Sequence, residues 1–142
     1  MHRSTQKGDY DMGKYILEAL QELNKLEEMA DDKSAILSQI RRLICHLLKC
    51  KYQPEYPHKR SWVNSIRNAQ QQIESIILKS GSLRRFYNKV DLKRLYVSGR
   101  NDAILETGKS KESFPDTCEW TLEQMADSTF IREFLIEYGK PL

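Results

Sequence analysis

The chain has 142 residues, of which 39% are hydrophobic and 30% are charged, and its formal net charge is +3. This size and composition predict one globular domain over residues 1–142 and exclude a disordered chain or a membrane protein. No apolar run reaches the roughly 18 to 20 residues of a membrane span, and no hydrophobic signal core follows Met1. The three cysteines have no CxxC spacing, which argues against a disulfide framework. We therefore expect a cytoplasmic protein without membrane contact, with residues 1–9 as a mobile tail.

Charge is distributed unevenly along the chain. Residues 1–40 hold 5 Lys or Arg and 8 Asp or Glu, residues 41–100 hold 14 and 3, and residues 101–142 hold 4 and 9. In a fold of neighbouring helices, the acidic ends could neutralise the basic middle inside the molecule. Alternatively, the basic middle forms a patch that binds an anionic partner. We expect the first arrangement.

Two segments show the spacing of an amphipathic helix most clearly. In residues 33–52 the apolar positions recur at steps of three and four, at Ile36, Ile40, Leu43 and Leu47. Asp31 or Asp32 would cap this helix, and Pro54 would end it. Residues 61–79 repeat the spacing, at Trp62, Ile66, Ala69, Ile73 and Ile76. Ser80-Gly81 then closes the second of these helices.

The remaining helical segments are shorter. Apolar spacing at Ile16, Leu20 and Leu23 marks a first helix that ends near Met29, before an acidic turn at Asp31-Asp32. A further helical stretch runs from Ser82 to Gly108 and is divided at Asp91. After a loop over residues 113–116, Thr121 and Gln124 have the spacing of a capping box, and a last helix runs through Phe130, Phe134 and Leu135.

These segments together predict the fold class. The sequence contains no alternating strand pattern and no hairpin dipeptide. We therefore predict an all-α fold, an antiparallel helical bundle of about four main helices with a short C-terminal helix.

Two ordered sets of motifs carry a family resemblance. The first set is His46-Leu47-Leu48-Lys49, Tyr52-Gln53-Pro54-Glu55 and Arg60-Ser61-Trp62. The second set is Leu105-Glu106-Thr107-Gly108, Phe114-Pro115-Asp116-Thr117-Cys118 and Thr121-Leu122-Glu123-Gln124. In the order and spacing of these motifs, residues 16–130 resemble the family called domain of unknown function 29, which is abundant in cyanobacteria. The resemblance implies an all-helical bundle and supplies no activity.

The chain departs from the family pattern at three places. Cys50 replaces a tryptophan, Glu119-Trp120 replaces Pro-Tyr, and of the family's acidic and aromatic N-terminal segment the chain has at most Asp9-Tyr10-Asp11. The surface that this segment would cover is then expected to stay apolar. Because apolar patches tend to be buried by partners, we expect a homodimer.

His46 and Cys50 form the one pair with the i, i+4 spacing of a metal site. Such a pair can supply half of a zinc site, which Glu106, Cys118 or His58 could complete. The alternative is a histidine satisfied by a neighbouring carboxylate beside a cysteine that packs as a small hydrophobe. We favour the alternative, because no second pair of this kind exists, and we expect neither a metal nor another cofactor.

Glu106 is the second candidate. Steps along its helix from Leu92 through Tyr96 and Ala103 place it on an otherwise buried face, where a carboxylate needs a partner. His46 and Arg67 are the natural partners. We favour a structural polar network of His46, Arg67 and Glu106 over a catalytic acid and base. No catalytic residue is assigned, since phosphate-binding glycine loops, HExxH and GxSxG are absent.

Three functional hypotheses follow. The preferred one is a non-enzymatic helical interaction module that binds another protein or its own copy. The second is a nucleic-acid-associated protein that uses the basic segment 41–100, and the third is a metal-dependent enzyme. The second hypothesis has eight candidate anion-binding residues, Arg41, Arg42, Lys49, Arg84, Arg85, Lys89, Lys93 and Arg94. We do not favour it, because no row of exposed aromatic residues is available to stack bases.

Overall fold

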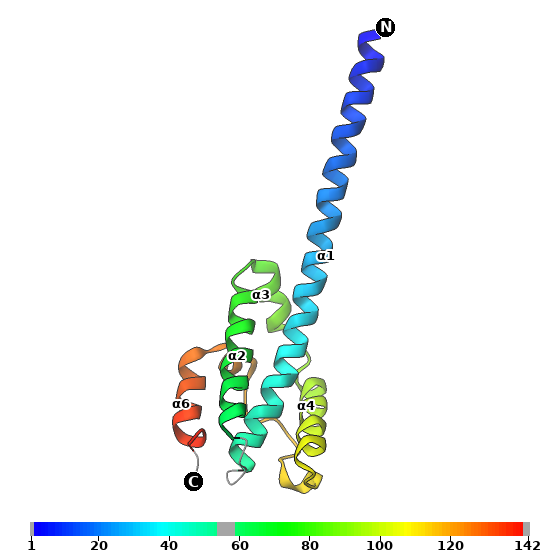
Figure 1. The fold of residues 1–142 in the computed structure, drawn as a ribbon. Helices are drawn as coiled ribbons and strands as arrows, with labels where there is room; N and C mark the ends of the chain where they lie inside the picture. The colour runs from blue at the N-terminus through cyan, green and yellow to red at the C-terminus, as the bar shows by residue number, and fades with distance from the viewer. Residues whose placement is uncertain (1, 54–58, 141–142) are drawn as a thin grey trace. The chain divides into compact units, whose positions relative to one another are not determined.

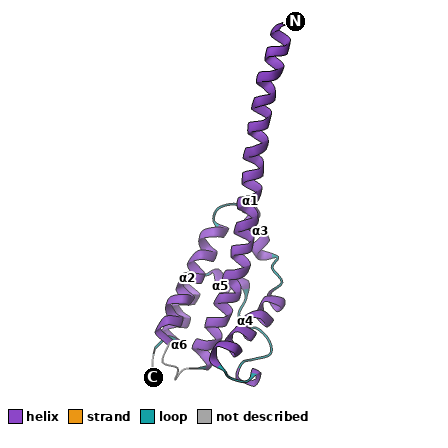
Figure 2. Ribbon diagram, turned by 45° about the vertical axis from the view of Figure 1, so that its right-hand side comes forward, coloured by secondary structure: helices purple, strands orange, loops and turns teal. Residues whose placement is uncertain are grey.

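The computed structural model describes residues 2–53 and 59–140, with the side chains of residues 2–10 left out (Figure 1). The elements are α1 (His2–Tyr52), α2 (Lys59–Ile77), α3 (Gly81–Asn88), α4 (Leu92–Thr107), the 3-10 turn η1 (Lys111–Ser113), α5 (Leu122–Ala126) and α6 (Ser128–Tyr138). No strand occurs in these residues (Figure 2), so the predicted all-α fold is confirmed. Within the same residues, no helix combines the length and the apolar character that a membrane span requires.

The chain forms two compact units, residues 1–32 and residues 33–142. We call the first unit the arm and the second unit the body. The arm consists of the first part of α1, and its side chains are described from Asp11 onward. The expected mobile tail at residues 1–9 lies outside the described side chains, and the expected single domain stays a prediction.

The predicted turn at Asp31-Asp32 is wrong, because α1 continues from His2 to Tyr52 as one helix. Two aspartates inside a helix cost only a few tenths of a kcal/mol each, relative to good helix formers. A break needs a residue that disrupts the backbone hydrogen bonds, and neither glycine nor proline occurs between Gly13 and Pro54. Asp31 and Asp32 therefore lie inside α1 and cap no helix.

The last turns of α1 form the most buried part of the body. The predicted positions Ile36, Ile40, Leu43 and Leu47 are all fully buried, which confirms the apolar stripe. Between Leu43 and Cys50, His46 alone is not buried. Figures 1 and 2 show the reason, since α2 and α4 lie on opposite sides of this part of α1. The body is therefore built around one central helix.

The predicted apolar stripe of α2 is also confirmed. Trp62, Ile66, Ala69, Ile73 and Ile76 are all buried. The helix ends at Ile77, two residues before the predicted end. Ser80 begins the next helix instead of closing this one, because its side chain accepts a hydrogen bond from the backbone N–H of Leu83.

Local capping signals position the later helices as the sequence predicts. The Asp91 side chain accepts a hydrogen bond from the N–H of Arg94 and so separates α3 from α4. Gly108 ends α4 with a φ of 68°, a conformation that favours glycine. At the start of α5, Thr121 and Gln124 form both hydrogen bonds of a capping box.

Gly99 allows α4 to approach α1 closely. A Cβ atom at this position would lie 2.7 Å from Ile44 Cγ2 and 3.0 Å from the Arg41 carbonyl oxygen. The first distance is shorter than Cβ contacts in real proteins, and the second is a tight contact with a backbone atom. The absence of a side chain at Gly99 therefore sets the spacing between the two helices.

We predict that Gly99→Ala destabilises the body by about 1 to 3 kcal/mol, because overpacking outweighs the higher helix propensity of alanine. The measurement is the free energy of unfolding in a denaturant titration. The matched control is Gly13→Ala, where a Cβ would meet nothing within 4 Å. This control should leave the body as stable as the wild-type chain. A Gly99→Ala chain with undiminished stability would contradict the close approach.

Candidate functional site

A polar cluster lies where α1 packs against α4. Glu106 Oε1 is 3.1 Å from Lys49 Nζ, and Glu106 Oε2 accepts a hydrogen bond from Cys45 Sγ at 3.0 Å. One turn earlier on α4, Asp102 accepts two hydrogen bonds from Arg41, at 2.6 and 2.8 Å. Such charge-assisted and bidentate contacts depend strongly on geometry. The two carboxylates therefore fix the register of α4 against α1.

Lys49 is the buried member of this cluster. Its side chain is 4% exposed, whereas that of Glu106 is 52% exposed. The Lys49 ammonium also lies 5.3 Å from the centre of the Trp62 ring, within cation–π range. Lys49 is one of the residues that the sequence offered for anion binding, but it is buried, because neighbouring helices cover α1 at this position. A buried ammonium needs a counterion, and Glu106 supplies it.

The structure brings together only part of the predicted network of His46, Arg67 and Glu106. Glu106 contacts Lys49 and Cys45, and its exposure corrects the expectation that it lies on a buried face. Arg67 is exposed on α2. His46 Nδ1 is buried and has no hydrogen-bond partner within the described part of the chain. The partner of Glu106 is therefore the cation three residues after His46.

The surroundings shift the pKa values of His46 and Glu106 in the same direction for different reasons. Burial, followed by the charge of Lys49, lowers the pKa of His46 to about 4. Partial burial raises the pKa of Glu106, but hydrogen bonds from Cys45 and Lys49 and the Lys49 charge outweigh it, so the pKa falls. At neutral pH the imidazole is therefore uncharged and the carboxyl group ionised. Below its ordinary pKa near 6.5, His46 takes up a proton in the unfolded chain but not in the folded chain. The contribution of neutral His46 to the free energy of unfolding is therefore complete above about pH 6.5 and is lost as the pH falls toward 4.

The cysteines are not activated for nucleophilic chemistry. Burial, together with the hydrogen bond to Glu106, raises the pKa of Cys45, and burial raises that of Cys50 to about 11. Burial also raises the pKa of Cys118. Since the thiolate is the reactive form, a raised pKa leaves each thiol inert at neutral pH.

His46 and Cys50 are not part of a metal-binding group in the part that the structure describes. No three His, Cys, Asp or Glu side chains gather there in a way that could hold a metal ion. Cys50 is fully buried and His46 is partly buried, both on α1. His58, which the sequence offered as a further ligand, lies outside the described residues.

The predicted anion-binding residues fall into two groups. Arg41 and Lys49 are engaged by Asp102 and Glu106, as described above. Acidic residues of the last third of the chain also bind Lys51, through Glu119, and Arg100, through Asp116. The remaining members of the set are exposed, and they are Arg42, Arg84, Arg85, Lys89, Lys93 and Arg94. The acidic end of the chain therefore neutralises one part of the basic segment and not the other.

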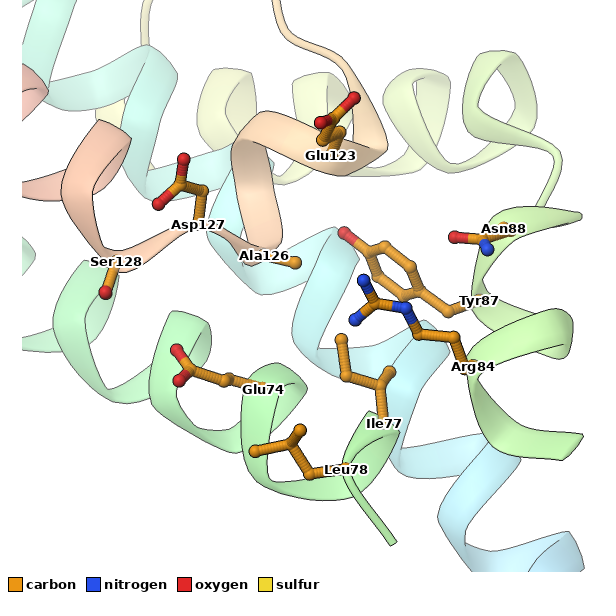
Figure 3. Close-up of a pocket in the computed structure, with 10 residues that line it drawn as sticks. All are labelled: Glu74, Ile77, Leu78, Arg84, Tyr87, Asn88, Glu123, Ala126, Asp127 and Ser128. Atoms are coloured by element: carbon orange, nitrogen blue, oxygen red, sulfur yellow. The ribbon is translucent and has the colours of Figure 1, made fainter. Parts of the chain in front are cut away.

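A cavity of about 660 Å³ opens between α2, α3, α5 and the start of α6 (Figure 3). Its walls carry the carboxylates Glu74, Glu123 and Asp127, and Figure 3 shows the Arg84 guanidinium beside the Tyr87 ring. Burial raises the pKa of Tyr87, whose hydroxyl donates a hydrogen bond to the Leu122 carbonyl. Sequence reasoning missed this cavity, because its lining residues come from four elements and have no common spacing.

The arm carries a second candidate surface. Seven large apolar side chains of the arm are between 53% and 64% exposed, and they are Met12, Tyr15, Ile16, Leu17, Leu20, Leu23 and Leu26. At 100° per residue, six of them lie within one stripe of α1. Leu17 lies about 130° from the centre of that stripe. The predicted periodicity of this segment is therefore present in a helix, but its apolar face is exposed.

The family profile described as "Domain of unknown function DUF29" matches residues 14–131. The chain belongs to this family. The match confirms the resemblance drawn from the motifs at His46 and Leu105. Neither curated proteins nor solved structures gave a match to the chain.

The DUF29 match includes the polar cluster and most of the apolar stripe. It begins inside the arm, before Tyr15, and so spans all of the apolar stripe except Met12. It also contains the whole polar cluster of α1 and α4. In this DUF29 chain, Lys49 and Glu106 belong to the two motifs that carry the family resemblance, and the structure joins these motifs by an ion pair.

We predict that Glu106→Ala lowers the free energy of unfolding by about 1 to 3 kcal/mol, because it leaves the Lys49 ammonium buried without a carboxylate. Chemical denaturation measures the change. Glu133→Ala is the matched control, since Glu133 is exposed on α6 and its loss should cost under about 0.5 kcal/mol. If Glu106→Ala costs no more than this control, Glu106 is not the counterion of Lys49.

Proposed function

We propose that this chain is a non-enzymatic helical interaction module that associates with its own copy through the apolar stripe of the arm. The observation that carries the proposal is the exposure of that stripe, in which every large side chain is more than half exposed. Soluble proteins rarely leave contiguous apolar patches of this kind uncovered unless the patch binds a partner. Burying one such side chain contributes about 1.5 to 3 kcal/mol, so a stripe of this length can hold two helices together.

The spacing of the stripe suits pairing between helices. Apolar residues follow one another at steps of four and three, at Met12, Ile16, Ala19, Leu23, Leu26 and Ala30. This is the a and d pattern of a coiled coil over almost three heptads. The opposite side of the helix is polar at Lys14, Gln21, Lys25 and Glu28, and Leu17 is its one large apolar residue. The arm therefore has one face that favours a partner helix and one face that favours water.

The chemistry of the body supports the non-enzymatic part of the proposal. The buried thiols have raised pKa values, and His46, with a pKa near 4, is a weak base at neutral pH. The Lys49, Glu106 and Cys45 contacts serve to join α1 to α4. We assign this cluster a structural role, in place of the acid and base roles of a catalytic pair.

A second candidate function is association with nucleic acid through the exposed cations of α3 and α4. Arg84, Arg85, Lys89, Lys93 and Arg94 are exposed within eleven consecutive residues, and Asp91 is the one acidic residue among them. The acidic side chains that bind Arg41, Lys49, Lys51 and Arg100 belong to other parts of the body. The aromatic residues of this segment are Phe86, which is partly buried beneath Lys33, and Tyr87, which is buried. Contacts would therefore be made to phosphates.

For the proposed self-association, we predict a dimer at tens of micromolar in sedimentation velocity. Leu23→Glu should weaken it by at least about a hundredfold, because two charges would enter the apolar seam. The matched control is Leu17→Glu, since Leu17 is similarly exposed but lies off the stripe, and it should leave the dimer intact. A wild-type chain that stays monomeric, or two variants that dissociate alike, would refute the stripe as the interface.

For the second candidate, we predict weak binding to a short DNA duplex that falls steeply with salt. If all five cations contact phosphates, the logarithmic slope should be about −4.5, and binding should be negligible near about 150 mM salt. Arg84→Glu with Arg85→Glu should abolish the low-salt binding, whereas Arg60→Glu with Arg67→Glu on α2 should not. A micromolar complex at about 150 mM salt, lost in the first pair alone, would place nucleic-acid association ahead of self-association.

A further inference from the structure

We infer that the two arms pair in an antiparallel orientation, with the two-fold axis at Gln21. This inference rests on the proposed self-association and specifies its partner surface residue by residue. Two orientations are available to a pair of identical helices with one heptad seam. They differ in which core residues face each other and in which flanking charges meet.

The core residues favour the antiparallel orientation by size. In that orientation an a residue faces a d residue of the second copy, so Ile16 meets Leu26, Leu23 meets Ala19 and Met12 meets Ala30. In two of these three pairs, Leu23 with Ala19 and Met12 with Ala30, a large side chain lies opposite a small one. In the parallel orientation Ala19 and Ala30 would each face their own copies and leave the seam underpacked.

The flanking residues favour the same orientation. In a parallel pair, Glu22 of each copy would lie beside Glu27 of the other copy, which gives two contacts between like charges. In the antiparallel pair, Glu27 lies beside Gly13, whose surroundings are open. Leu20 then meets its own copy on one side of the seam, and Tyr15 meets Met29 on the other.

One like-charge contact remains in the antiparallel pair, between the two copies of Glu22 at the axis. In the arm itself, Lys25 Nζ lies 3.6 Å from Glu22 Oε1. Each Glu22 therefore brings its own counterion to the axis. Since this ion pair is present in either orientation, the difference is that the antiparallel pair has one acidic contact and the parallel pair has two.

The register is tested by disulfide capture with two single-cysteine additions to the full chain. An Ile16→Cys chain is mixed with a tagged Leu26→Cys chain, oxidised mildly and separated by mass without reductant. The wild-type chain reports any background from its own cysteines. Positions 16 and 26 face each other in the antiparallel pair, whereas two copies of either position lie roughly 15 Å apart along the helix. The mixed product should therefore exceed either like product by at least about tenfold.

Each outcome has one meaning, because sedimentation of the reduced variants establishes whether the dimer persists. A dimer that gives mainly like products would show a parallel pair, and a dimer that gives neither product would place the interface elsewhere; both overturn this inference. Absence of any dimer of the wild-type chain would refute the proposed function and this inference with it.

A surface variant gives a second readout without altering the seam. Glu27→Lys should leave the dissociation constant within about twofold of the wild-type value in an antiparallel pair, because position 27 faces Gly13. In a parallel pair it would create two attractions to Glu22 and tighten the dimer by about tenfold. Tightening of that size would overturn the antiparallel orientation even if the cysteine variants failed to associate.

Discussion

Burial of every α1 residue between Leu43 and Cys50 except His46 is the constraint on which the rest of the body depends. A helix that is buried in this way needs neighbours that approach it closely, and Gly99 makes this possible on the side of α4. It also needs a partner for each polar group that it carries inward. Lys49 is such a group, and Glu106 and the Trp62 ring surround its ammonium. The polar cluster is therefore a consequence of the packing of α1.

The uneven charge along the sequence reflects which segments contact each other in the body. The end of α1 is basic, and acidic side chains from α4 and the loops after it bind its cations, as Asp102 does for Arg41 and Glu119 for Lys51. Basic and acidic segments distant in sequence are thereby joined in the body, which supports the intramolecular neutralisation predicted for the basic middle. The cations of α3 and the start of α4 lie outside this pairing. The chain, with its net charge of +3, thus has ion pairs at the end of α1 and an exposed basic segment in α3 and the start of α4.

Local signals in the sequence predicted much of the fold, and contacts between distant residues account for what was missed. The stripes of residues 33–52 and 61–79, the cap at Asp91 and the end at Gly108 are properties of adjacent residues, and all are present. The partner of Glu106 lies on another helix, so helical spacing could not identify Lys49, and the buried face that it predicted for Glu106 is exposed. The acidic pair at residues 31 and 32 has the composition of a helix cap, but no backbone-breaking residue accompanies it, and α1 continues through it.

In the proposed dimer, a second copy covers the arm segment of α1, whereas the segment at residues 36–50 belongs to the core of the body. Hydrogen exchange along α1, followed by mass spectrometry at submicromolar and at hundred-micromolar concentration, tests this division most directly. We expect the amides of residues 36–50 to be strongly protected at both concentrations. The amides of residues 12–30 should exchange fast in the dilute sample and slowly in the concentrated one. Protection of residues 12–30 that is the same at both concentrations would contradict the account.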